Sequence, residues 1–202
     1  MEKIRLYNVL DEYVNYLIQF DKKVLSCKED DRKHGRKYLG AVLQIEDFKY
    51  FIPLSSPKDS DYIKVDGILT IRKSVPPLMR IVVKDKVGSN ELKGTLKFSS
   101  MIPIPDIALL NYDVTKEVDE TYKILVLKEI SFINSNSEAI IKNARVIYNQ
   151  KMNNYNIGYV KSIVDFELLE KKCKEYEIIK QALTESSKQI ATTEDSTKNA
   201  VT

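Results

Sequence analysis

The fold of this chain is decided by residues 38–59, which read YLGAVLQIEDFKYFIPLSSPKD. Two β-rich runs, 38–45 and 48–54, are separated only by Glu46-Asp47, so they are predicted to form an antiparallel hairpin. The second run continues directly into the segment Ser55-Ser56-Pro57-Lys58. The stretch therefore joins a predicted strand to a turn that carries two hydroxyl groups and an ammonium group.

This turn has two interpretations. In the first, Ser56 is an N-cap, Pro57 is the first helical residue and Asp59 is a capping-box acid, which describes an ordinary helix start. In the second, the free N–H groups and the positive dipole end of that helix hold a phosphate beside Ser55, Ser56 and Lys58. The local chemistry alone favours the ordinary helix start, because Ser-Pro turns are common.

The composition is that of a soluble globular protein. The 202 residues are 43% hydrophobic and 30% charged, which predicts one domain, placed at 1–180. The net charge of +3 does not indicate nucleic-acid binding, so a basic patch would have to come from the placement of charges. The N-terminus lacks an apolar signal core and no apolar run has membrane-spanning length, so a cytoplasmic location is expected.

Metal and disulfide chemistry are not predicted. Cys27 and Cys173 are too few and too far apart for a disulfide framework or a metal site. The single histidine, His34, lies in the polar run 28–37 and is interpreted as a loop residue. Without a Cys/His cluster, no metal or other cofactor is expected.

The periodicity changes along the chain from strand-like to helical. Asp11 is predicted to cap a helix in which Tyr13, Tyr16 or Leu17, and Phe20 share one face. Residues 186–202 are rich in Thr, Ser and Lys and are predicted to be disordered. This order indicates an α+β fold built on a compact, strongly bent antiparallel sheet or barrel with added helices. The other predicted strands are 3–9, 67–72, 80–84, 92–98 and 107–113, and the other helices are 118–134, 137–150 and 160–176.

Several segments, in order and at compatible spacing, together resemble the endoribonucleases of type III toxin–antitoxin systems, the ToxN/AbiQ family. The combination of the first-helix motif with the Pro-Leu-Ser-Ser-Pro-Lys segment carries most of this resemblance. It extends from the N-terminus to about Tyr176. The segments that carry it are YVNYL at 13–17 with 20–24, YLGAVLQI at 38–45, KYFIPLSSPK at 49–58, residues 97–98 with MIPI at 101–104, and residues 122–123 with 132–136.

The resemblance implies an SH3-like barrel similar to the Kid/MazF toxins, and cleavage of RNA without metal by attack of the 2′-hydroxyl, which leaves a 2′,3′-cyclic phosphate. It also implies an antitoxin made of repeated small RNA, which the toxin cuts into pseudoknots and then binds in closed protein–RNA rings. The expected biological role is abortive infection, a defence against phage. The alternatives are a non-catalytic RNA-binding module and a protein-interaction scaffold.

The resemblance also implies a set of catalytic residues. Ser56 and Ser55 would bind the scissile phosphate or the 2′-hydroxyl, and Lys58 would supply positive charge. Arg36 or Lys37 would stabilise the phosphorane oxygens, and the sequence leaves the choice between them open.

Four further residues are assigned less directly. Tyr13 would bind a phosphate or act as a weak acid, while Phe20, Tyr122 and Lys123 would contact RNA. Phe20 on an apolar helical stripe is more often a core residue, and a lone surface lysine is usually only solvated. With one histidine in a polar loop, catalysis is expected to depend on Lys, Arg, Tyr, Ser or Thr.

Overall fold

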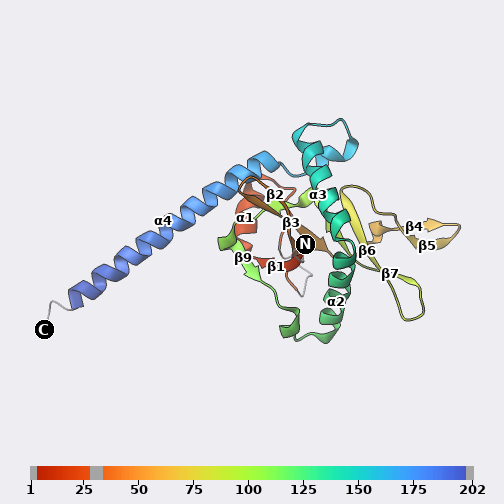
Figure 1. Ribbon diagram of the computed structural model, residues 1–202, viewed down its shortest axis with the longest axis horizontal. Coiled ribbons are helices and arrows are strands. Elements are labelled where there is room, and N and C mark those ends of the chain that lie inside the picture. Colours follow the sequence, from red (N-terminus) through yellow and green to blue (C-terminus); the bar gives the residue numbers. More distant parts are fainter. Residues whose placement is uncertain (1–3, 28–33, 199–202) are drawn as a thin grey trace.

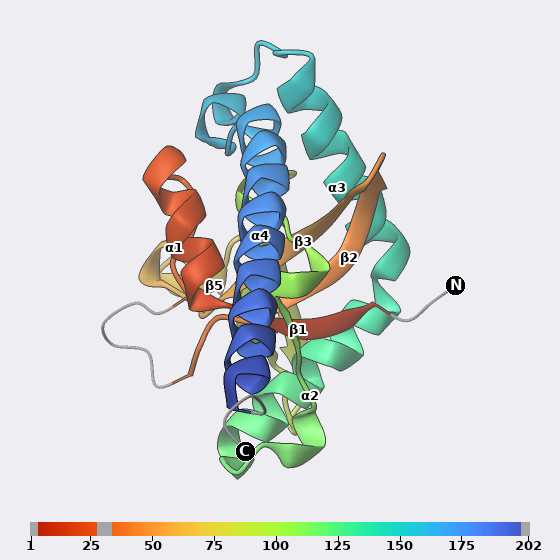
Figure 2. The same ribbon diagram turned by 90° about the vertical axis from the view of Figure 1, so that its left-hand side faces the viewer.

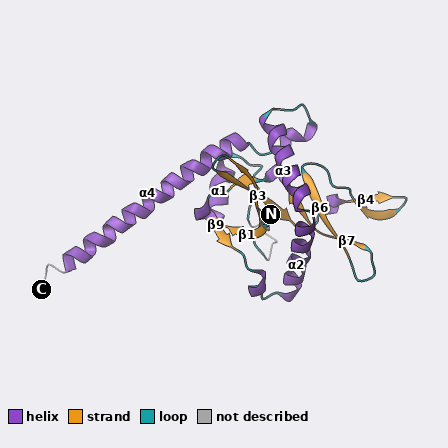
Figure 3. Cartoon of the chain, viewed as in Figure 1, coloured by secondary structure: helices purple, strands orange, loops and turns teal. Residues whose placement is uncertain are grey.

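The computed structural model describes residues 4–27 and 34–198 (Figure 1). A group of antiparallel strands lies at the centre of the body, and the helices lie around it (Figure 3). The start of the predicted strand at residue 3, and residues 28–33 of the polar run, lie outside the described residues. The architecture is a mixed fold of helices and antiparallel sheet, as the sequence predicts.

The central hairpin is confirmed. Strand β2 (Tyr38–Ile45) pairs antiparallel with β3 (Phe48–Ser55). The turn between them places Glu46 at φ 50°, in the left-handed region. A register shift between Leu39 and Leu43 marks a bulge, which bends the pair. Almost every residue of β3 is buried, so this strand lies at the centre of the core.

The sheet is bent but open. Its hydrogen-bonded order is β6-β7-β3-β2-β1-β9, and the end strands β6 and β9 are not paired with each other in the part of the chain that the structure describes. Strand β3 pairs with the short β8 at Tyr50 and Phe51, and with β7 only at Leu54 and Ser55. The sheet therefore splays along β3, and its described strands do not close into the predicted barrel. The remaining strands of this sheet are β1 (Arg5–Val9), β6 (Leu78–Lys84), β7 (Asn90–Lys97), β8 (Ile102–Pro103) and β9 (Leu109–Asn111).

A second hairpin projects from the body on the side away from the C-terminus (Figure 1). It consists of β4 (Tyr62–Val65) and β5 (Ile68–Ile71). Asp66 and Gly67 both have positive φ, which is the requirement of a tight two-residue hairpin turn. The sequence predicts β5, but it misses β4, whose residues are mostly exposed and follow a short helical turn.

Three helices cover the sheet, and the predictions for their limits hold to within a few residues. Helix α2 (Glu120–Ser135) packs on β6 and β7, and α3 (Ser137–Met152) packs on β2. Helix α1 (Asp11–Phe20) begins one residue earlier than predicted, because Leu10 is the N-cap and Asp11 is already helical. The acid at Asp11 still favours the helix, since it lies at the positive dipole end.

Helix α4 (Phe166–Lys198) packs against α1 and α3 at its start and then extends away from the body (Figures 1 and 2). The helix continues through 186–198, where the composition predicts disorder. Gln, Ala, Glu and Lys in this stretch are good helix formers, and the prediction gave more weight to Ser and Thr. Residues 199–202 lie outside the described part. None of the described helices is both long and apolar enough to cross a membrane.

Gly40→Ala is expected to lower the free energy of unfolding by about 1–3 kcal/mol. A Cβ atom at position 40 would lie 2.1 Å from Cδ1 of Phe51, and that ring is buried in the core. Urea unfolding measures the loss. Gly35→Ala is the control, because a Cβ there meets no atom within 4 Å. Equal stability of the two variants would show that the Phe51 ring can move away without cost.

Candidate functional site

The Ser-Ser-Pro turn does not begin a helix. Ser55 is the last residue of β3, and residues 56–58 have no regular structure. A single helical turn follows at Asp59–Asp61, capped at Lys58, whose backbone N–H donates to Asp61 Oδ2 at 2.9 Å. The predicted N-cap role of Ser56 and the capping-box role of Asp59 are therefore wrong, and no helix dipole reaches the hydroxyl groups.

A buried ion pair holds the turn instead. Arg80 on β6 donates to Asp61 Oδ1 from Nε at 3.1 Å, and its Nη2 lies 2.9 Å from the same oxygen. Both side chains are almost fully buried. Removing one partner from such a pair leaves an uncompensated buried charge, so the pair holds the loop firmly against β6.

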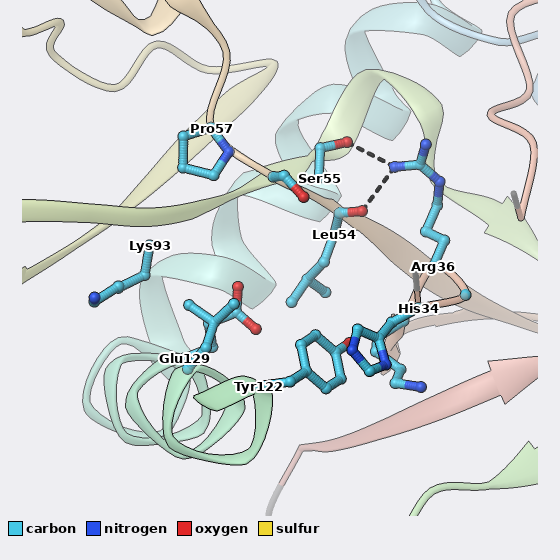
Figure 4. A pocket seen from close by; sticks show the side chains of 12 residues that line it. His34, Arg36, Leu54, Ser55, Pro57, Lys93, Tyr122 and Glu129 are labelled. Carbon is cyan, nitrogen blue, oxygen red and sulfur yellow. Dashed lines mark hydrogen bonds between the residues drawn. The ribbon is translucent and has the colours of Figure 1, made fainter. Parts of the chain in front are cut away.

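Arg36 lies directly behind the turn. Its side chain is 3% exposed, and Nη1 donates to the Leu54 carbonyl and to Ser55 Oγ, both at 2.7 Å (Figure 4). Nε donates to the Ser26 carbonyl at 2.8 Å. These bonds fix a permanent positive charge beside Ser55. Because Ser55 Oγ accepts from Arg36, its own hydrogen remains to be donated to a further acceptor.

Lys37 is held differently from Arg36. Its Nζ donates to Asn8 Oδ1 at 2.8 Å and lies 4.1 Å from the centre of the Tyr112 ring. Burial lowers the pKa of Lys37, and nearby Glu117 opposes that shift. The ammonium is therefore directed toward β1 and Tyr112, whereas the guanidinium of Arg36 contacts the serine turn.

A pocket of about 270 Å³ brings many of the predicted residues together. One side is the end of β3 with the segment 34–37, and the other is helix α2 (Figure 4). Lys93 on β7 also contributes, so the lining comes from four separate segments of the chain. The predicted site residues that line the pocket are Ser55, Ser56, Arg36, Lys37 and Tyr122.

Tyr13 and Phe20 lie elsewhere. The Tyr13 side chain is fully buried, and its hydroxyl donates to the Pro103 carbonyl at 2.7 Å. Burial raises the pKa of Tyr13 well above its usual value, which is unfavourable for proton donation. Phe20 is partly exposed on α1, with its ring beside Tyr16 and 4.2 Å from Nζ of Lys172. Neither side chain lines the pocket.

Lys58 and Lys123 also lie outside the pocket lining. Lys58 is exposed at the far end of the serine turn. Lys123 pairs with Glu120 one turn away on α2, with Nζ and Oε1 3.1 Å apart. Lys58 nevertheless belongs to a group of cations around the turn. Half-buried Lys97 on β7 has a lowered pKa, mainly from burial, with Lys58, Arg80 and Arg36 adding to the effect and Asp61 opposing it.

Glu129 is a pocket residue that the sequence analysis missed. It lies on α2, is 7% exposed and has no ion-pair partner among the described residues. Burial raises its pKa from 4.5 to about 7. A signal was present in the sequence, because Glu129 lies one turn from both Val126 and Ile133, on the buried face of the helix. An acid on such a face is unusual and points to a function.

Gly94 on β7 makes room for that carboxyl group. A Cβ atom at position 94 would lie 2.5 Å from Glu129 Oε1 and 3.2 Å from the Ser55 carbonyl oxygen. The Glu129 carboxyl can lie this close to the β7 backbone only because residue 94 is a glycine. Helix α2 can therefore place an acid against the strand that pairs with Ser55.

Gly94→Ala is expected to displace the Glu129 carboxyl, and a reaction that uses this acid should then slow about tenfold or more, since a shift of ~1 Å can cost up to about 10²-fold. The fold should survive, since the carboxyl is the mobile end of a side chain. Single-turnover rates and thermal unfolding should be compared with those of Gly158→Ala, where a Cβ meets nothing within 4 Å. An unchanged rate would mean that the position of Glu129 is unimportant.

His34 lies in the loop before β2, as predicted, and it also lines the pocket. Its ring stacks on Tyr122 with centroids 3.8 Å apart and an interplanar angle of 3°. Its Nε2 lies 3.4 Å from Asp119 Oδ2. No three His, Cys, Asp or Glu side chains in the described ranges are grouped to hold a metal ion.

Comparison with known proteins identifies the family. Residues 5–174 match the model of the toxin ToxN of type III toxin–antitoxin systems. The chain belongs to the ToxN family. It is 33% identical to the endoribonuclease AbiQ of Lactococcus lactis subsp. lactis over 86% of this chain and 89% of AbiQ. It is 26% identical to the endoribonuclease ToxN of Pectobacterium atrosepticum over 86% of this chain and 94% of that one.

Solved structures agree with this assignment. One is AbiQ, a lactococcal anti-phage endoribonuclease of the type III toxin–antitoxin system, with a TM-score of 0.71 and 30% identity over 87% of this chain and 99% of AbiQ. Another comes from a bacterial antiviral system regulated by a processed non-coding RNA. It has a TM-score of 0.71 and 25% identity, over 85% of this chain and 98% of that chain. As a ToxN-family member, the protein is an endoribonuclease toxin of a type III system, as the resemblance implied.

Proposed function

We propose that the pocket between β3 and α2 is where this toxin cleaves RNA, by attack of a 2′-hydroxyl on the adjacent phosphate without a metal ion. One observation carries the proposal: hydroxyls, a fixed guanidinium and a buried acid meet in one pocket of an endoribonuclease toxin. RNA supplies the nucleophile, so the protein must align it, take its proton, stabilise the phosphorane and protonate the leaving 5′-oxygen.

The positions of the side chains suggest a division of roles. Arg36, bonded to Ser55, is the cation that stabilises the phosphorane oxygens. Ser56 and Ser55 donate hydrogen bonds to the phosphate. Glu129, with a pKa of about 7, takes the proton of the 2′-hydroxyl, because a group that titrates near neutral pH is an effective base there. Lys37 keeps RNA in place from the side of Asn8.

The substrate strand is expected to leave the pocket over the cations around the serine turn. Lys58 and Lys97 flank this exit, and Tyr122 offers a ring to a base on the other side. Lys123 on α2 and Phe20 on α1 remain predicted RNA contacts, which would require the strand to extend well beyond the pocket. The modest net charge of the chain does not oppose binding, because the cations are locally concentrated.

The partner is a small repeated RNA that folds as a pseudoknot. The toxin processes this antitoxin and is inhibited by it in a closed protein–RNA ring. Support comes from the membership of a type III family and from the related antiviral system that a processed non-coding RNA regulates. A cytoplasmic location follows from these RNA partners. The open sheet is proposed to be a splayed relative of the Kid/MazF barrel.

Purified protein incubated with RNA in excess EDTA tests the proposal. The expected products carry 2′,3′-cyclic phosphate and 5′-hydroxyl ends, and one 2′-deoxy nucleotide at the cut site should block cleavage there. Activity that is lost in chelator and restored by magnesium would contradict the metal-free reaction. Binding without cleavage would favour the RNA-binding module, although that alternative gives no role to a buried acid beside the phosphate site.

Lys58→Ala should flatten the salt dependence of antitoxin binding. Each lost phosphate contact reduces the slope of log K against log salt by about 0.7–0.9. The control is Lys180→Ala on α4, where Nζ bonds Glu12 of α1 and the residue does not line the pocket. Slopes measured by filter binding at several salt concentrations separate the two variants. If the slopes were equal, Lys58 would be solvated surface and the RNA would lie elsewhere.

A further inference from the structure

His34, Tyr122 and Asp119 form a preorganised group at the edge of the pocket. Asp119 is the N-cap of α2, and its Oδ1 accepts from the backbone N–H groups of Thr121 and Tyr122, both at 3.1 Å. Its other oxygen lies 3.4 Å from His34 Nε2. The imidazole therefore has two neighbours on α2: the Tyr122 ring, which stacks on its face, and the Asp119 carboxylate beside Nε2, which accepts two backbone hydrogen bonds.

We propose that His34 donates the proton to the leaving 5′-oxygen during RNA cleavage, and that Asp119 and Tyr122 position its ring. This inference rests on the proposed function of the pocket. An imidazole held by a carboxylate through one nitrogen and used through the other is a recurring arrangement for proton transfer. Because Nε2 lies beside Asp119, Nδ1 is the nitrogen that exchanges the proton, and it has no hydrogen-bond partner among the described residues.

The surroundings of the ring suit a donor. Asp119 and Tyr122 face it from α2, and Lys93 lines the same pocket from β7. Lys93 bonds Glu91 on its own strand, so part of its charge is neutralised. Lys37 lies 5.9 Å from the centre of the Tyr122 ring. Of these groups, Asp119 is the one within ion-pair distance of the imidazole.

The step balances with Glu129 as the base. The 2′-oxygen loses its proton to the Glu129 carboxylate while the bond from this oxygen to phosphorus forms. The bond between phosphorus and the 5′-oxygen breaks, and the proton on His34 Nδ1 moves to that oxygen. The products are a 2′,3′-cyclic phosphate and a 5′-hydroxyl. Glu129 ends protonated and His34 neutral, and exchange with water restores both.

The experiment compares two substrates that differ only in the leaving atom. One is an ordinary oligoribonucleotide, and the other has sulfur in place of the bridging 5′-oxygen at the cut site. A thiolate leaves without protonation, so the sulfur substrate does not need the donor. His34→Phe keeps a ring on Tyr122 but cannot donate a proton. Its single-turnover rate should fall about 10²-fold on the oxygen substrate and stay near the wild-type rate on the sulfur substrate.

Two further variants strengthen the test. His34→Asn guards against a folding defect of the phenylalanine variant, and thermal unfolding checks both. Asp119→Asn keeps an N-cap oxygen but loses the charge, so it should slow only the oxygen substrate, by a smaller factor. If His34→Phe slows both substrates equally, His34 binds or packs and is not the donor. If the wild-type protein cleaves neither substrate, the proposed function itself fails, and this result is distinct from the first.

Discussion

Glu129→Gln is expected to slow RNA cleavage about 10³-fold and at the same time to stabilise the fold above pH 7. The rate falls because the amide cannot take the proton of the 2′-hydroxyl, and a positioned base contributes roughly 10²–10⁴-fold. In the wild-type protein the rate should rise with pH through about 7, the pKa to which burial raises this carboxyl. That rise should be absent from the variant.

The effect on stability has the opposite sign. Between its usual pKa of 4.5 and about 7, Glu129 keeps its proton in the folded protein but loses it in the unfolded chain. The folded state then binds more protons, so wild-type stability falls as pH rises through this window. Glu129→Gln removes the burial of a charge, and it should add ~2–3 kcal/mol to the free energy of unfolding at pH 8.

Single-turnover kinetics and urea unfolding at pH 4.5 and pH 8 measure both effects. Glu138→Gln, on the exposed surface of α3, controls for the loss of one charge. It should leave the rate unchanged and, because Glu138 lies in the first turn of α3, it should lower stability by no more than about 0.3–1 kcal/mol. A fully active Glu129→Gln protein would rule out the acid as base. A variant that lost stability at pH 8 would show that the carboxylate is well solvated or paired in the fold.

Ser56→Ala is expected to reduce cleavage by about 10²–10³-fold, the cost of one lost preorganised donor, with almost no change in stability. Ser56 is exposed, and none of the hydrogen bonds among described residues involves it. Because no helix starts at this turn, the loss of ~1 kcal/mol that follows removal of a cap is not expected. The Ser56 hydroxyl is therefore free to bind the phosphate of the RNA in the proposed reaction, and the fold does not depend on it.

Ser55→Ala is the matched comparison. It removes the hydroxyl that accepts from Arg36 at 2.7 Å, so it should lower stability by about 1–3 kcal/mol as well as activity. Toxicity on induced expression, cleavage in vitro and urea unfolding distinguish the two variants. If Ser56→Ala were fully toxic, or if it lost as much stability as Ser55→Ala, the serine turn would be a structural feature only.

The sequence predicts those elements whose pattern is strong and local. The β2–β3 hairpin follows from two apolar runs around Glu46-Asp47, and α3 begins at Ser137, the first residue of the predicted helix 137–150. The sequence wrongly predicts a helix after Ser56-Pro57, because a tertiary contact determines the structure of this turn. Asp61, which the sequence gives no reason to connect to Arg80, anchors the turn through a buried pair and no helix follows.

The sequence predicts only part of the pocket lining, because tertiary contacts determine which residues lie together there. Five of the predicted site residues line one pocket, and their roles stay predictions: Ser55, Ser56, Arg36, Lys37 and Tyr122. Tyr13 does not line the pocket, because its ring is buried in the core and its hydroxyl bonds the Pro103 carbonyl. Glu129 and His34 were missed because they reach the pocket only through tertiary structure, which brings α2 and residue 34 to one pocket across about 70–95 residues of sequence.

A crystal structure with a non-cleavable RNA tests the central claim most directly. The RNA should carry a single 2′-deoxy nucleotide at the site that the protein cuts. We expect the phosphate that follows this nucleotide to lie in the pocket, within hydrogen-bond distance of the Ser56 hydroxyl, with the Glu129 carboxyl beside the 2′ carbon. An RNA bound with that phosphate outside the pocket, for example along α4 or the β4–β5 hairpin, would contradict the account.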